Sequence, residues 1–198
     1  MIRLWKWCAA GGALAPAVWV AGAVSTGRAG ADPVEYLLHF TGNTAFILLL
    51  VTLGLGPAAR LSGLWGIAAP RRWLGVLTFC WAFAHLGVWI GLDQFFAWTF
   101  AWRELQGRPY LWAGLFTFAV LALLTATSTD GWMRRLGRAR WSLLHKLAYV
   151  AAGTALLHQV LQVRADYAVF YLYAAALGVI IAARLASMAV TGSNKRGP

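Results

Sequence analysis

Four histidines are the residues whose type and position point to chemistry: His39, His85, His145 and His158. Each lies within or at the edge of a long apolar stretch. A ligating side chain is costly to bury in lipid, so such residues inside membrane helices are functional candidates by default. A neutral imidazole is a good ligand for iron. If the apolar stretches cross a membrane, these residues suggest a metal centre within it.

The spacing of three of these histidines suggests a haem iron. His145 and His158 are 13 residues apart in one apolar stretch, so on a continuous helix they share a face and lie about 20 Å apart along its axis. His85 lies 12 residues into another stretch, which crosses in the same direction. His85 and His158 are therefore predicted at similar depth, where they can ligate one metal from two sides. A flat porphyrin between two helices fits this arrangement.

His145 is predicted one level nearer the cytoplasm. Arg71 lies 14 residues before His85, at the position where a second haem would need a histidine ligand. Arginine is a poor iron ligand but a good partner for a haem propionate. Three arrangements are open. In the first, one haem lies between His85 and His158 and His145 is structural; in the second, an additional inner haem uses His145 with Arg71 or a weak sixth ligand. In the third, a single haem lies between His85 and His145. The His85–His158 pair is favoured.

Other kinds of centre fit less well. No Asp or Glu lies within the predicted spans, so a His–carboxylate zinc or iron site would be under-ligated, and a proton pump or ion channel would lack its carboxylates. Cys8 and Cys80 lie in apolar runs and are expected to be small buried hydrophobes. No CxxCH occurs, so covalent attachment of a c-type haem is not indicated.

The elements that position the histidines follow from composition. The chain is 61% hydrophobic and 12% charged, whereas a soluble domain carries about a quarter charged residues. Its 12 Trp fit the aromatic belts of a membrane protein. We predict an all-α fold, with one transmembrane domain over residues 1–198 built as a six-helix bundle. The predicted helices cover about 4–24, 42–56, 73–92, 110–125, 141–161 and 168–188.

The distribution of charge predicts the orientation. With the N-terminus inside, four of the 17 Lys and Arg residues fall outside: Arg28, Arg103, Arg108 and Arg164. All acidic residues except Asp130 also fall outside. Because cytoplasmic loops carry the excess of basic residues, both termini are predicted on the cytoplasmic side of a bacterial inner membrane. Arg3, Lys6 and the Ala21-Gly22-Ala23 site resemble a signal peptide, but the length and the following spans favour a retained anchor.

Two clusters near the ends of the spans have an ordinary and a functional interpretation. The inner cluster consists of Arg134, Arg135, Arg138 and Arg140. Topology alone accounts for it, and docking of an acidic flavoprotein or a flavin phosphate is the functional alternative. On the outer side, His39 with Arg103 and Arg108 could line a haem edge or a quinol pocket, or His39 is an ordinary interfacial residue. No GxGxxG follows a strand, so this chain is not expected to oxidise NAD(P)H.

A series of short motifs runs in order from about residue 31 to residue 160 with consistent spacing. The motifs are Ala31-Asp32-Pro33-Val34, His39-Phe40-Thr41-Gly42, Arg71-Arg72 with Leu74-Gly75, Trp81-Ala82 leading to His85-Leu86, Arg108-Pro109-Tyr110, Thr127-Ser128-Thr129, Arg135-Leu136-Gly137, Trp141 with Leu144-His145 and Tyr149, and His158. Each motif is weak evidence alone. Taken together, the motifs show that the chain resembles the ferric reductase-like transmembrane family, and within that family the membrane subunits of periplasmic methionine sulfoxide reductase systems.

This resemblance implies a role in electron transfer. It implies haem b bound at His85, His145 and His158, and flavin (FMN) in some members. It implies a periplasmic molybdopterin enzyme, MsrP, as the partner that repairs oxidised methionines. Electrons would come from the quinone pool or a cytosolic flavin reductase. The chain departs from the family pattern at Gln159, where an aromatic is common, and at Gly56-Pro57-Ala58, where Thr-Pro-Leu is common.

Two alternatives belong to other functional classes. One is a stand-alone transmembrane reductase of ferric iron or copper, which an open outer haem edge would allow. The other is a haem-free membrane scaffold, which has no use for three aligned histidines.

Overall fold

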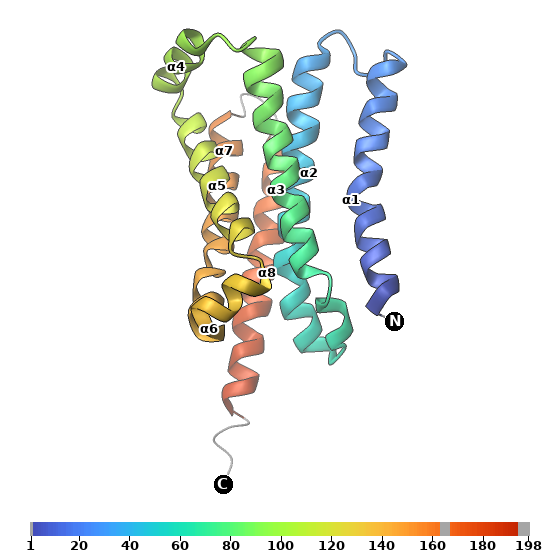
Figure 1. Ribbon diagram of the computed structural model, residues 1–198, viewed down its shortest axis with the longest axis vertical. Coiled ribbons are helices and arrows are strands. Elements are labelled where there is room, and N and C mark those ends of the chain that lie inside the picture. The colour runs from blue at the N-terminus through green and yellow to red at the C-terminus, as the bar shows by residue number, and fades with distance from the viewer. Residues whose placement is uncertain (1, 163–166, 194–198) are drawn as a thin grey trace.

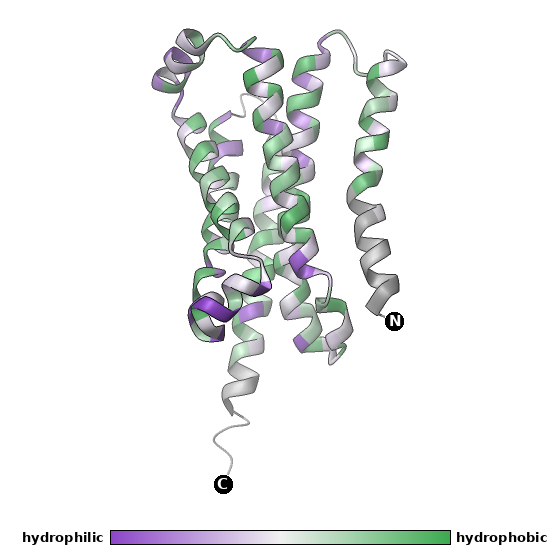
Figure 2. Ribbon diagram, in the orientation of Figure 1, coloured by the Kyte–Doolittle hydropathy of each residue, from purple (hydrophilic) through white to green (hydrophobic). Residues whose placement is uncertain are grey.

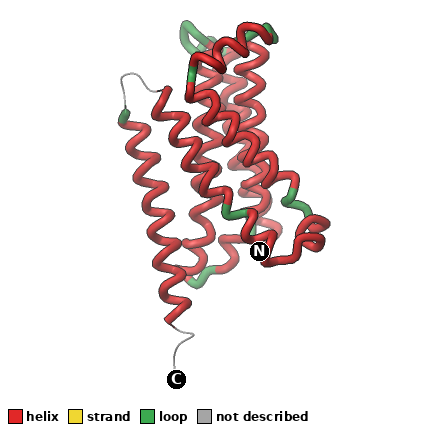
Figure 3. Tube along the Cα trace, turned by 90° about the vertical axis from the view of Figure 1, so that its left-hand side faces the viewer, coloured by secondary structure: helices red, strands yellow, loops and turns green. Residues whose placement is uncertain are grey.

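The computed structural model describes residues 2–162 and 167–193, with side chains over 14–162 and 167–188. In these ranges the chain is helical and has no strand (Figures 1 and 3), which confirms the predicted all-α class. The helices are α1 (Ile2–Ser25), α2 (Pro33–Ser62), α3 (Arg71–Val88), α4 (Trp98–Gly107), α5 (Pro109–Ala126), α6 (Asp130–Leu144), α7 (Leu147–Gln162) and α8 (Ala168–Ser193). A 3-10 turn, Trp65–Ala68, precedes α3, and a π-helical turn, Trp89–Asp93, follows it. Several residues of the sequence predictions lie outside the described side chains: Arg3, Lys6, Cys8, Arg164, Asp166, Lys195 and Arg196.

Four helical segments of the described chain are long and apolar enough to cross a membrane. They are Pro33–Ser62, Trp65–Asp93, Pro109–Ala126 and Ala168–Met188. Helix α7 has 16 residues, and the apolar part of α1 with described side chains covers Leu14–Ser25. Helix α7 is shorter than the roughly 20 residues that a perpendicular crossing takes, whereas α1 as a whole has 24 residues. The structure therefore supports four spans by length and composition.

The bundle is built from two closely packed helix pairs. Helix α2 packs mainly on α3 and α5 packs mainly on α7, while α8 closes the side next to α2 and α7. Their shared core is formed by residues such as Phe46, Leu50, Leu121, Ala152 and Leu177. Helix α1 stands at the edge of the bundle (Figure 1). Apolar residues cover the helices along their length, and the hydrophilic ones gather toward the two ends (Figure 2), as expected of a bundle surrounded by lipid.

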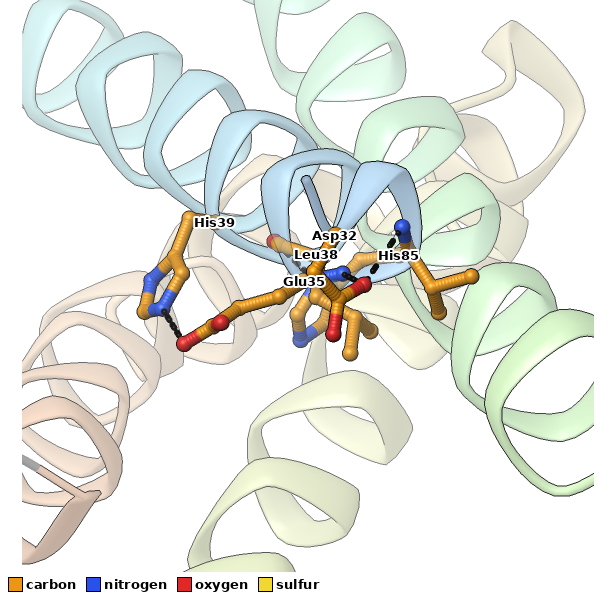
Figure 4. Close-up of polar contacts among 6 residues, drawn as sticks. Asp32, Glu35, Leu38, His39 and His85 are labelled. Carbon is orange, nitrogen blue, oxygen red and sulfur yellow. Dashed lines mark hydrogen bonds and ion pairs between the residues drawn. The ribbon is translucent and has the colours of Figure 1, made fainter. Parts of the chain in front are cut away.

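Helix α2 is longer than predicted at both ends. It starts at Pro33 instead of residue 42 because Asp32 caps it: the Asp32 carboxylate accepts hydrogen bonds from the amides of Val34 and Glu35, both at 3.0 Å (Figure 4). The helix does not end at about residue 56 as predicted, because it continues through Pro57. It ends only at Gly63, whose φ of 72° is the left-handed conformation typical of a helix C-cap.

The segment around His145 also differs from the prediction. Residues 127–137, between the predicted helices 110–125 and 141–161, contain the start of α6, which begins at Asp130 after the Thr129 cap. Gly137, with φ 71° and ψ 156°, breaks this helix internally, and a turn separates Leu144 from Leu147. His145 lies in that turn. The predicted continuous helix over 141–161 is therefore wrong, and His145 and His158 do not share one helix.

The connection between α3 and α5 contains a helix that was not predicted. Helix α4 is amphipathic and only 10 residues long, so it carries no span-like signal. Ala101 and Leu105 are buried toward the bundle, while Glu104 forms an ion pair with Arg108 at 3.0 Å. The connection lies at the end of the bundle opposite to the start of α1 and the end of α8 (Figure 1).

Candidate functional site

A cavity of about 420 Å³ lies among α2, α3, α5, α7 and the start of α8. Its volume is in the range of ordinary cofactor sites. His39, His85 and His158 line it, together with mostly apolar residues. No Asp, Glu, Lys or Arg belongs to its described lining. The cavity is therefore suited to a large, mainly apolar group that histidines can bind.

His85 is held by the neighbouring helix α2. Its Nδ1 is 3.0 Å from the carbonyl oxygen of Leu38 (Figure 4) and 3.2 Å from the Thr41 hydroxyl. A carbonyl can only accept, so Nδ1 carries the proton and donates to Leu38. In the neutral imidazole this leaves the lone pair on Nε2. Such an Nδ1–H to carbonyl bond is the arrangement that orients a metal-binding histidine.

His158 is held in the same way by helix α5. Its Nδ1 lies 2.7 Å from the carbonyl oxygen of Tyr110, so it donates to that oxygen. Nε2 of His158 is again left as the basic nitrogen. Each of the two helix pairs thus contributes one histidine on one helix and the carbonyl that orients it on the other.

The two oriented rings face each other across the cavity. Their centroids are 6.2 Å apart, and the ring planes are nearly perpendicular, at 84°. Two metal–nitrogen bonds of about 2 Å, with about 1 Å from each nitrogen to its ring centre, add up to a similar spacing. The described residues contain no group of three or more His, Cys, Asp or Glu that could hold a metal ion. The pair fits a metal whose other ligands come from a bound group.

A family model for the "Ferric reductase like transmembrane component" matches residues 41–156. The chain belongs to the ferric reductase-like transmembrane family. The matched range contains His85 and His145, and His158 follows it by two residues. Membership of this family, together with the apolar helices, makes the chain a multi-pass membrane protein.

Curated relatives in this ferric reductase-like family share one name, "Protein-methionine-sulfoxide reductase heme-binding subunit MsrQ". The relative from Caulobacter vibrioides is 37% identical over 153 residues, which cover 77% of this chain and 73% of the relative. The relative from Rhodospirillum rubrum is 39% identical over 175 residues, 87% of this chain and 83% of the relative. The relative from Ralstonia nicotianae is 33% identical over 163 residues, which cover 81% of this chain and 75% of the relative.

Two glycines make room for the histidine rings, and sequence reasoning gave them no role. A Cβ at Gly42 of α2 would lie 3.1 Å from Cε1 of His85. A Cβ at Gly114 of α5 would lie 2.9 Å from Nδ1 of His158. A side chain at either position would push the ring away from its carbonyl partner. Gly42 stands inside one of the family motifs, but its function is visible only once α2 and α3 are paired.

His145 and Arg71 lie outside the lining of this cavity. His145 stacks on Trp141 at a centroid distance of 3.9 Å, and its Nε2 is 3.4 Å from the Thr127 hydroxyl. Nη1 of Arg71 lies 3.1 Å from where a Cβ of Gly56 would stand, on α2.

Arg72 is the cation near His145. It is close enough for its charge to act on the imidazole, and it also donates to Asp130 at 2.5 Å. This hydrogen bond and the positive charge hold the pKa of the Asp130 carboxyl below its usual value. The pair fastens the start of α6 to the start of α3, next to His145.

The predicted outer group is only partly assembled at the cavity. His39 lines the cavity mouth and faces Glu35, with 3.7 Å between Nε2 and the carboxylate (Figure 4). Arg108 is instead engaged by Glu104 and by the Tyr110 hydroxyl, at 3.0 and 2.9 Å. Arg103 lies over the ring of Phe100. Neither arginine lines the cavity.

Proposed function

We propose that this chain is a haem-binding membrane subunit that passes electrons to a periplasmic methionine sulfoxide reductase. The observation that carries the proposal is the His85–His158 pair, two imidazoles 6.2 Å apart whose Nδ1 atoms donate to carbonyls, which leaves the lone pair of each neutral ring on Nε2. The names of the MsrQ relatives point to the same cofactor.

The cavity residues fit a haem b. His85 and His158 would hold its iron, the apolar lining would contact its ring, and the porphyrin would supply the further iron ligands that the described residues do not provide. A bound haem supplies a one-electron iron couple. The protein's part is to hold both imidazoles neutral and oriented, and to keep water from the ring. In the alternative arrangement His145 is the ligand for a second, inner haem, with Arg71 or a weak sixth ligand on the other side.

The proposed path leads from the cytoplasm to the periplasm. In this proposal α1 and α7 cross the membrane with the four longer segments, giving six spans in a single domain of the bacterial inner membrane with both termini in the cytoplasm. The basic helix α6 then lies on the inner side. The donor is the quinone pool or a cytosolic flavin reductase, with FMN as a second cofactor, and the acceptor is MsrP.

The test is electron transfer in a defined membrane. The protein in nanodiscs is reduced with dithionite, excess reductant is removed, and reoxidation is followed after adding the periplasmic molybdopterin enzyme with a methionine sulfoxide substrate. Fast, enzyme-dependent reoxidation supports the proposal. The family's description suggests the second candidate, a stand-alone ferric or cupric reductase. Reoxidation by ferric or cupric chelates, with no response to the molybdopterin enzyme, would favour it.

Substitution of His145 separates the one-haem and two-haem arrangements. Because His145 lies outside the cavity, His145→Ala is expected to leave the spectrum of the His85–His158 haem unchanged. The haem-to-protein ratio, measured beside the unsubstituted protein, then shows whether His145 holds another haem. An equal ratio means one haem and a halved ratio means two. Complete loss of haem would contradict the assignment of His158 as a ligand.

The basic face of α6 is expected to receive the cytosolic donor. Arg134, Arg135, Arg138 and Arg140 are all exposed. Replacing them with glutamine should slow haem reduction by a flavin reductase about 10-fold or more at low ionic strength, because electrostatic steering is lost. Stopped-flow reduction at several salt concentrations measures this. Arg103→Gln, on α4, is the control, and equal slowing by the control would rule out a specific docking face.

A further inference from the structure

The polar residues of the cavity lie on one side of it. His39 and Asn43 come from α2 and are four residues apart, and Gln159 and Gln162 come from α7 and are three apart, so each pair shares a helix face. The side formed by α3 and α5 is apolar apart from His85 and Thr117, with residues such as Leu86, Trp89, Leu115 and Phe118. The α2–α7 side of the cavity is therefore polar, and the α3–α5 side is mainly apolar.

Gln159 is the residue of this polar side with an unmet hydrogen bond. Its Nε2 donates to Oδ1 of Asn43 at 3.3 Å, and its Oε1 is buried without a partner. A buried polar atom without a partner is destabilising, so the position favours a bound group that completes the bonding. If both amides turn by 180°, the Asn43 amide donates to Gln159 and the Gln159 N–H groups become free for an acceptor.

The acceptor that suits this side is a carboxylate. The described cavity lining holds no Lys or Arg, so the amide groups and the imidazole of His39 at the mouth are the hydrogen-bond donors that the α2–α7 side offers an anion. The lining also holds no Asp or Glu that would repel one. A tetrapyrrole has the matching shape, with two carboxylates on one edge and apolar substituents on the others.

We propose, on the basis of the haem function above, that the Asn43–Gln159 amide pair anchors the carboxylate edge of the haem. The haem carboxylates then point to the α2–α7 side, and the apolar edge faces α3 and α5. Gln159 is a positioning residue in this arrangement: it does not ligate iron but fixes the rotation of the ring about the His85–His158 axis.

The experiment combines a change in the ligand with a change in the protein. Purified apoprotein, unsubstituted or with Gln159→Leu, is loaded with haem b or with its dimethyl ester, and the rate of haem transfer to apomyoglobin is measured. In the unsubstituted protein the ester is expected to leave about 10-fold faster than haem b, because the charge-assisted hydrogen bonds are lost. With Gln159→Leu that difference should shrink to about 2-fold or less, while the spectrum still shows two histidine ligands. Gln106→Leu on α4, an exposed residue, is the control.

Three results would overturn the proposed anchor. Equal sensitivity to esterification in the unsubstituted and Gln159→Leu proteins overturns the anchor while leaving the haem function intact. So does unchanged haem retention in Gln159→Leu combined with slower oxidation of a soluble quinol, which would assign the polar side to a quinol. Failure of the unsubstituted protein to bind haem overturns both the proposed function and the anchor. Should Gln159→Leu fold poorly, Asn43→Ser tests the same pair.

Discussion

Replacing His85 or His158 with alanine is expected to remove the six-coordinate haem. Each residue would supply one of two axial nitrogens, and changes to groups that merely orient a metal ligand already cost about 10–100-fold in affinity. Loss of the ligand itself should therefore cost more than about 100-fold. The absorption spectrum of the purified variants should show either no haem or a five-coordinate, high-spin haem.

Two controls separate loss of a ligand from loss of the fold. His39→Ala, at the cavity mouth, should keep the six-coordinate spectrum. Adding imidazole to His85→Ala or His158→Ala should restore it where the cavity is intact. A six-coordinate spectrum in both alanine variants without added imidazole would contradict the ligand pair.

Adding a methyl group at Gly114 is expected to have the next largest effect. The new Cβ would lie 2.9 Å from Nδ1 of His158, so the ring must move and its 2.7 Å bond to Tyr110 is strained or lost. Overpacking of this kind costs about 1–3 kcal/mol. Gly114→Ala should lower haem affinity about 10–100-fold, as expected when the group that orients a ligand is lost. Titration of apoprotein with haem measures the change.

The structure provides a matched set of glycines for this test. Gly42→Ala should act in the same direction on His85 but less strongly, because its closest approach is 3.1 Å. Gly153, on α7 with His158, has nothing within 4 Å of its added Cβ, and Gly153→Ala should bind haem normally. Equal affinities in Gly114→Ala and Gly153→Ala would show that the ring does not depend on the space at Gly114.

The sequence was most informative about residues that are energetically costly to place in lipid. Histidines are expensive in apolar spans, so their presence alone marked the site. The depth of His85 and His158 follows from helical rise, and the two rings do lie together, 6.2 Å apart. The orienting carbonyls of Leu38 and Tyr110 carry no sequence signal, since every residue has a carbonyl. Gly42 and Gly114 depend on which helices pair, which periodicity does not specify.

The errors around His145 have a local cause. The expectation that it shares a face with His158 assumed one unbroken helix, but α6 ends at Leu144 and α7 begins at Leu147, and His145 lies in the turn between them. Arg72, the residue after Arg71 on α3, is a residue whose charge acts on His145. Adjacent residues on a helix point about 100° apart, so spacing along α3 alone does not decide which of the two faces α6.

The absorption spectrum of the unsubstituted protein, purified in detergent and recorded before and after dithionite, shows whether this chain binds haem through two histidines. We expect a low-spin, six-coordinate haem b with two histidine ligands in both oxidation states, present at one haem per chain or more. A protein that carries no haem, or a haem that is five-coordinate and high-spin as isolated, would contradict it.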